Sequence, residues 1–84
     1  MQRDIIQNWL IDYFVRTNKI DKEEILGLID EDYLELGYID SMGLMVFVVE
    51  IESHFQIRFE AEHFQDKKFT NISGLSEMIL NLSK

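Results

Sequence analysis

Ser41 is the residue whose neighbours could support chemistry. Asp40 precedes it and Gly43 follows two positions later, which matches part of the pattern around the nucleophilic serine of hydrolases. That pattern also requires a glycine two positions before the serine, where this chain has Ile39. We expect no sheet on which such a serine could stand, and the two histidines of the chain are close to background frequency. We therefore predict no catalytic residue and no enzymatic activity of the chain alone.

A metal site is not expected either. The acidic run at 30–32 resembles the start of a calcium-binding loop, which requires Gly at its sixth position and Glu at its twelfth. This chain has Glu35 and Ser41 at those positions. The histidines lack the helical spacing of a zinc site, and the chain has no cysteine for a thiolate ligand, a disulfide or a thiol nucleophile. Its four glycines are isolated, so no phosphate-binding glycine loop is expected.

The composition predicts one folded, acidic domain spanning residues 1–84. Hydrophobic residues make up 46% of the chain, which is too much for a disordered tail, and 16 acidic residues against 8 basic ones give a net charge of −8. That charge disfavours nucleic acid and anionic membranes, whereas a basic protein surface would complement it. The longest apolar run, 42–49, is far shorter than the roughly 20 residues of a membrane span, and no signal peptide is evident. We expect a cytoplasmic protein without membrane insertion.

Apolar residues at helical spacing predict the two outer helices. The first helix should end near Asn18, and the last should begin after a cap at Thr70 and Asn71. The predicted core stripe of the first helix is Ile5, Ile6, Trp9, Leu10, Tyr13 and Phe14. That of the last helix is Ile72, Leu75, Ile79 and Leu82.

The central segment from Met42 to Phe55 contains a β-branched run that could also form a buried strand. Two features favour a helix: Asp40 and Ser41 form a good N-terminal cap, and apolar residues recur at steps of four, three and four. Those apolar residues are Leu44, Val48, Ile51 and Phe55.

Shorter elements connect these helices. Asp21 with Glu24 resembles a capping box for one or two helical turns, and the rest of 19–40 should be a long ordered loop. Residues 55–59 alternate and should be extended, and 60–65 could form a short helix. The predicted fold class is therefore all-α, a small four-helix bundle with a long loop between the first two main helices and a short third helix.

Residues 36–43, with the triplet Asp40, Ser41 and Met42, resemble the prosthetic-group attachment motif of the acyl and peptidyl carrier proteins. The resemblance continues through 50–55, 57–64 and 72–82, and so covers most of the chain. It implies an acyl-carrier-like bundle in which Ser41 is esterified with 4′-phosphopantetheine donated by coenzyme A. A phosphopantetheinyl transferase would supply the catalysis, and Asp40 would contribute to capping and to recognition by that enzyme. The resemblance thus implies a non-catalytic phosphoprotein that works as a monomer.

The same resemblance implies that the helix after Ser41 is read by partner enzymes. The implied docking residues are Met42, Met45, Val49, Glu50 and Glu52. For the three apolar residues, an alternative is that they complete the core, and both interpretations stay open. Many fatty-acid carriers have a more acidic helix here, which puts docking to standard fatty-acid synthase enzymes in doubt.

A narrower similarity to the D-alanyl carrier proteins lies in residues 40–43 and 59–71. The predicted function is to carry an acyl or aminoacyl group as a thioester on the Ser41 arm. Partner enzymes with basic docking surfaces would load and unload it in fatty acid, polyketide, nonribosomal peptide or related specialised biosynthesis. The alternative is an acidic helical interaction adaptor in which Ser41 is only part of a helix cap.

Overall fold

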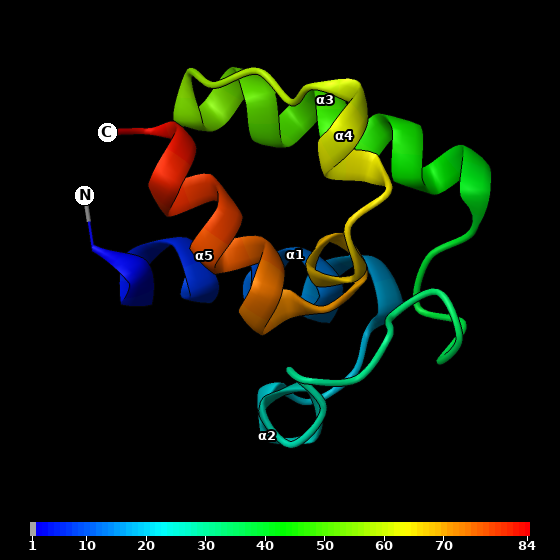
Figure 1. Ribbon diagram of the computed structural model, residues 1–84. Helices are drawn as coiled ribbons and strands as arrows, with labels where there is room; N and C mark the ends of the chain where they lie inside the picture. Colours follow the sequence, from blue (N-terminus) through cyan, green and yellow to red (C-terminus); the bar gives the residue numbers. More distant parts are fainter. Residues whose placement is uncertain (1) are drawn as a thin grey trace.

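The computed structural model describes residues 2–84, and within this range the regular elements are all helical (Figure 1). The α-helices and one short 3-10 helix, in chain order, are α1 (Arg3–Asn18), α2 (Lys22–Leu26), α3 (Ser41–Phe55), α4 (Ala61–Phe64), η1 (Lys67–Thr70) and α5 (Ile72–Leu82). The predicted all-α carrier-like bundle is confirmed, with a long connection before α3 and a short helix after it. No helix of residues 2–84 has the length and apolar character needed to cross a bilayer.

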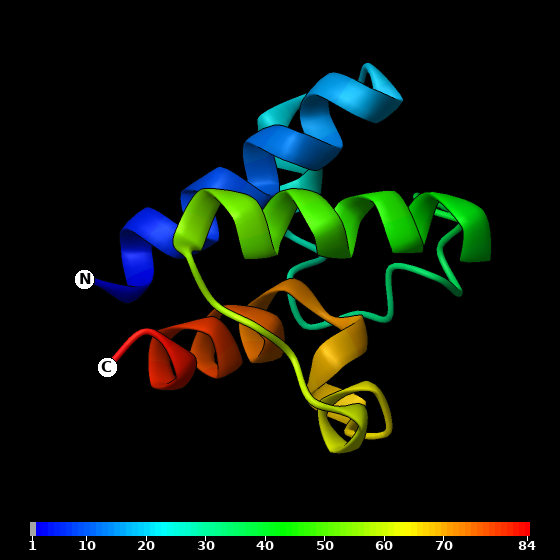
Figure 2. The same ribbon diagram turned by 90° about the horizontal axis from the view of Figure 1, so that it is seen from above.

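Helices α1 and α5 pack against each other, and α3 lies across them (Figures 1 and 2). The start of α1 and the end of α5 lie on the same side of the molecule in both views. Large aromatic side chains fill the space between α1 and α3: the Phe47 ring lies 4.6 Å from the Tyr13 ring and 5.1 Å from the Phe14 ring, centroid to centroid. Helix α3 is therefore held against α1 by aromatic packing, and the burial of these rings helps to stabilise the domain.

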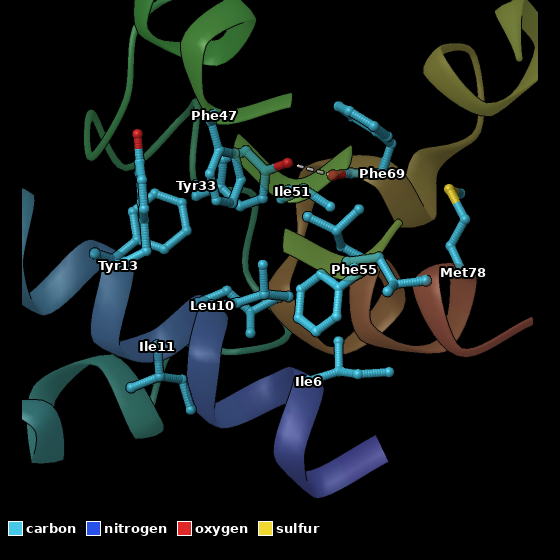
Figure 3. Close-up of a cluster of buried hydrophobic side chains, with 14 of the residues drawn as sticks. Ile6, Leu10, Ile11, Tyr13, Tyr33, Phe47, Ile51, Phe55, Phe69 and Met78 are labelled. Carbon is cyan, nitrogen blue, oxygen red and sulfur yellow. Dashed lines mark hydrogen bonds between the residues drawn. The ribbon is translucent and has the colours of Figure 1, made fainter. Parts of the chain in front are cut away.

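Tyr33 fastens the long connection to the C-terminal half of the chain. Its hydroxyl donates a hydrogen bond to the Phe69 carbonyl, as Figure 3 shows, and its amide donates to the Thr70 carbonyl at 2.9 Å. The ring is fully enclosed and lies 5.2 Å from that of Phe14. Burial raises the pKa of the Tyr33 hydroxyl, so this group remains a neutral hydrogen-bond donor. The connection is thus anchored from within the core.

The helix ends follow the predicted signals in most places. Helix α1 ends at Asn18, and Asn71 caps α5 by accepting a hydrogen bond from the Gly74 amide at 2.6 Å. Asp21 is the N-cap residue of the predicted short helix α2, but the predicted capping box is wrong, because the Asp21 side chain accepts no hydrogen bond. Backbone hydrogen bonds to the Asp21 carbonyl and the burial of Ile25 hold this five-residue helix instead.

Some of the predicted core positions are also corrected. Ile5 is 58% exposed, whereas Ile11 is fully buried, so the buried stripe of α1 is turned toward Ile11. In α3, Phe47 is fully buried although the predicted stripe left it out. Phe47 lies four residues before Ile51 and therefore shares its face of the helix. The apolar stripe of a core-facing helix is wider than one residue per turn, so the predicted stripe was too narrow. The extended segment begins after Phe55, which still belongs to α3.

Candidate functional site

Asp40 fixes the point at which α3 begins. Its backbone is extended, and its Oδ1 accepts a hydrogen bond from the Gly43 amide at 2.7 Å, while its carbonyl accepts from the Leu44 amide at 2.8 Å. The predicted N-terminal cap is therefore confirmed. Ser41 follows as the first residue of the helix, with an exposed side chain. Its hydroxyl is presented to solvent at the positive end of the helix dipole.

Gly43 lets the cap approach the helix closely. A Cβ atom at this position would lie 3.1 Å from Oδ1 of Asp40 and 3.1 Å from Cγ1 of Ile39. Both contacts are tight, so a larger residue would push the cap and the preceding residue away from the first turn. In the sequence, Gly43 belongs to the incomplete hydrolase pattern and to the carrier motif at 36–43, and in the structure it shapes the surroundings of Ser41.

The segment before Ser41 is held by local hydrogen bonds. Oδ1 of Asp32 accepts from the amides of Leu34 at 2.8 Å and Glu35 at 3.2 Å, and the Tyr38 amide donates to the Tyr33 carbonyl at 3.1 Å. Asp32 therefore stabilises a turn, which is the structural use of one member of the acidic run. Ser41 is presented by a well-fixed connection on one side and a capped helix on the other.

An open groove of about 710 Å³ begins at Ser41 and runs between α1, the 34–40 segment and α3. Its lining is mainly alkyl and aromatic: Tyr13, Thr17, Leu34, Gly37, Tyr38, Ile39, Asp40, Ser41, Gly43 and Val46. This groove could not be predicted from the sequence, because its walls come from three segments that only the tertiary fold brings together.

Tyr13 contributes a neutral hydroxyl to this groove. Burial, together with the nearby Glu50 carboxylate, raises the pKa of Tyr13 to about 12. The guanidinium of Arg16 lies 5.5 Å from the centre of the Tyr13 ring. At neutral pH Tyr13 therefore contributes a protonated phenol to the groove.

The predicted apolar docking residues face solvent. Met42 is 80% exposed, Met45 72% and Val49 63%, so they do not complete the core. Val46 is 58% exposed and lies on the same helix between them, although the sequence analysis did not single it out. We call Met42, Met45, Val46 and Val49 the outer face of α3. An exposed apolar surface of this kind is typical of a binding surface.

The two predicted acidic docking residues differ in their surroundings. Glu50 is exposed. Glu52 is half-buried, and its carboxylate accepts a hydrogen bond from the Phe59 amide at 2.9 Å. Glu52 thus holds the segment that follows α3, a use that the sequence pattern did not reveal.

Both histidines have structural roles. His54 stacks on Trp9 with 4.8 Å between ring centres, near the end of α3 remote from Ser41. Nδ1 of His63 accepts a hydrogen bond from the Glu60 amide at 2.7 Å and closes the capping box of α4. Ser41 therefore lies at an exposed helix end, while both histidines are occupied elsewhere. This arrangement suits a serine that another enzyme modifies.

A family model described as "Phosphopantetheine attachment site" matches residues 8–79, which include the groove and the whole of α3. The chain belongs to this carrier family. Its cofactor is 4′-phosphopantetheine, and a carrier of this family is non-catalytic and acts together with partner enzymes.

Several proteins similar to this chain bear the name D-alanyl carrier protein. The chain is 32% identical over 60 residues to a D-alanyl carrier protein of Streptococcus mutans serotype c, covering 71% of this chain and 76% of that protein. It is 38% identical over 61 residues to a D-alanyl carrier protein of Streptococcus suis, covering 68% and 77%. The carrier is thus close to the D-alanyl carrier proteins. No solved structure gives a significant match.

Proposed function

We propose that Ser41 is the attachment residue for 4′-phosphopantetheine and that the arm carries an acyl or aminoacyl group as a thioester. In the loading step, the Ser41 Oγ forms a bond to the phosphorus of the pantetheine phosphate of coenzyme A. The bond from that phosphorus to the bridging pyrophosphate oxygen breaks, adenosine 3′,5′-bisphosphate leaves with that oxygen, and the serine proton passes to the leaving group or to solvent. The catalysis comes from a separate transferase.

The observation that carries the proposal is the position of Ser41 within the matched family region. Its side chain is exposed on the first turn of a capped helix. A phosphodiester there is favoured by the helix dipole by roughly 0.3–1 kcal/mol. The charge of Asp40 opposes this, so we assign Asp40 to capping the helix and to recognition by the transferase. The exposed site and the groove beside it can accommodate the arm without displacing the core.

The names of the similar proteins support an aminoacyl cargo. The similar proteins are named D-alanyl carrier proteins. We therefore infer that this chain carries a small amino acid, with D-alanine as the first candidate. Enzymes that activate an amino acid and transfer it to the arm thiol would be its loading partners.

We further propose that partners dock on the outer face of α3. This face lies immediately after Ser41, so a partner bound there would have the arm within reach. Eight of the sixteen acidic residues and one of the eight basic residues fall between residues 20 and 40, so this segment is strongly negative. The outer face of α3 is apolar by contrast. The complementary partner has an apolar centre opposite α3 and basic residues opposite the 20–40 segment.

The attachment is tested by incubating the purified chain with coenzyme A and a promiscuous phosphopantetheinyl transferase, followed by intact-mass measurement. We expect a mass gain of one arm, no gain in Ser41→Ala, and an unchanged gain in Ser53→Ala, an exposed serine on the same helix. No gain under conditions that load a control carrier would refute the attachment and favour the adaptor alternative.

Docking is tested with Met45→Glu in the protein that already carries the arm. We expect the variant to fold normally, because Met45 is exposed. We expect an amino-acid-activating partner to transfer its amino acid to the arm of this variant more slowly. Ile5→Glu is the matched control, since Ile5 is 58% exposed on α1 and lies outside both the outer face of α3 and the 20–40 segment. Equal loading rates for Met45→Glu and the unchanged protein would remove Met45 from the docking face.

A further inference from the structure

We propose that the phosphopantetheine arm binds to its own carrier in the groove between α1, the 34–40 segment and α3, and that Tyr13, Thr17 and Val46 hold it there. The inference deepens the proposed function and rests on attachment at Ser41. It assigns a binding site to an apolar surface that the attachment chemistry alone does not require.

The groove is continuous with the attachment point. Ser41, Asp40 and Gly43 line it where α3 begins, and Tyr13 and Thr17 line it from α1. The Tyr13 ring lies 4.6 Å from that of Phe47, which is six residues or about 9 Å along the helix from Ser41. An arm tethered at Ser41 therefore reaches Tyr13 by following the groove alongside α3.

The lining matches the chemistry of the arm. Pantetheine combines a dimethyl-substituted carbon with two amides and a terminal thiol. The side chains of Leu34, Ile39 and Val46 offer alkyl surface for the methyl groups and methylenes. The Thr17 hydroxyl donates its hydrogen to the Tyr13 carbonyl at 2.9 Å, which leaves its oxygen able to accept from an amide of the arm.

Tyr13 supplies a further polar group in the same groove. Because its pKa is raised to about 12, its hydroxyl stays protonated over the range in which thioesters are handled. The oxygen of this neutral phenol can accept a hydrogen bond from an amide of the arm, whereas a phenolate would repel the phosphodiester. The groove thus offers apolar walls with a few hydroxyls, the usual composition of a small-molecule site.

The interior offers the arm no comparable place. Phe14 and Phe47 are fully buried and Tyr33 is 1% exposed, and their rings are in mutual contact. Figure 3 shows the Tyr33 and Phe47 rings side by side. Inserting the arm among them would require the core to open, at the high cost of overpacking. The outer face of α3 is the other apolar surface near Ser41, but apart from Val46 its residues do not line the groove. The groove is the site that can hold the arm without rearrangement.

The first test compares nuclear magnetic resonance spectra of the isotope-labelled chain before and after the arm is added from coenzyme A. We expect chemical-shift changes at Thr17, Val46 and the Tyr13 ring, in addition to those near Ser41. Changes confined to residues 39–43 would show that the arm moves freely in solvent and would overturn the inference. A chain that accepts no arm at all would instead refute the attachment proposal.

The second test measures the rate at which iodoacetamide alkylates the arm thiol. If the arm occupies the groove about two thirds of the time, the thiol should react on the order of threefold more slowly than free pantetheine. Thr17→Trp fills the groove and should restore the faster rate. Asn8→Trp, at an exposed position of α1 outside the groove, should not.

Circular dichroism checks that both variants are folded. Should Thr17→Trp fail to fold, Val46→Gln removes an apolar wall without adding bulk, and it should also restore the faster rate. Equal alkylation of the unchanged carrier and of free pantetheine contradicts arm binding.

Discussion

Replacing Phe47 should be among the most damaging changes in this chain, although Phe47 lies two residues from one of the most exposed side chains. Phe47 is fully buried and contacts the rings of Tyr13, Phe14 and Tyr33, whereas Met45 is 72% exposed. Truncating a buried Phe to Ala costs about 3–5 kcal/mol. A domain of 84 residues has a total free energy of unfolding of about 4–13 kcal/mol. Phe47→Ala therefore removes a large share of the stability.

A milder variant keeps the measurement within range if Phe47→Ala does not fold. Phe47→Leu retains an apolar side chain but loses the aromatic contacts, so we expect a loss of about 1–2 kcal/mol. Met45→Ala is the matched control and should change the free energy of unfolding by less than about 0.5 kcal/mol.

The assay is urea unfolding followed both by circular dichroism and by the fluorescence of Trp9, the one tryptophan of the chain. Trp9 stacks on His54 and contacts Phe55, so its fluorescence reports on the contact between α1 and α3. Coincident transitions from the two signals would justify a two-state analysis. A loss below about 1 kcal/mol in Phe47→Ala, or an equal loss in Met45→Ala, would show that the assigned faces of α3 are wrong.

Three further outcomes follow from particular contacts. Asp40→Ala should lower the free energy of unfolding by about 0.5–2 kcal/mol in urea titrations, because the helix cap is lost. Asp40→Asn can still cap the helix and should lose far less stability. Equal losses in the two variants would exclude capping as the cause. Gly74→Ala should cost about 1–3 kcal/mol in thermal unfolding, because its Cβ would lie 2.6 Å from the Lys68 carbonyl oxygen, whereas Gly27→Ala, with its nearest contact at 3.6 Å, should be nearly neutral. The pKa of Tyr13 in the folded state, about 12, lies above its ordinary value of 10.0. Between these two values the folded state retains a proton that the unfolded state loses. The free energy of unfolding should therefore fall as pH rises from about 10 to about 12. Tyr13→Phe should show a smaller fall across that pH range, and an identical pH profile would count against the raised pKa.

The sequence predicted those features that depend on neighbours along the chain. The caps at Asp40 and Asn71 were predictable because each is a short polar side chain directly before an apolar helical repeat. The end of α1 at Asn18 was predictable because the repeat stops there. The carrier motif itself lies in one contiguous segment, so it too could be recognised from the sequence.

What the sequence did not predict depends on packing between distant segments. Phe47 and Val46 are adjacent and both apolar, and only the positions of α1 and Tyr33 determine that Phe47 is buried while Val46 is exposed. The hydrogen bond of Glu52 requires the chain to turn back after α3. The groove beside Ser41 was hidden for the same reason, since its walls come from residues 13–17, 34–40 and 41–46.

The bonds that Tyr33 makes have a consequence for how the newly made chain matures. Tyr33 binds the carbonyls of Phe69 and Thr70, and the Ser73 amide donates to the Ile29 carbonyl at 2.9 Å. During synthesis, the connection that leads to Ser41 therefore cannot settle until residues 69–73 have left the ribosome, because its anchoring partners follow it by 36 residues or more. A transferase that recognises the settled connection would therefore act only after residues 69–73 have been made.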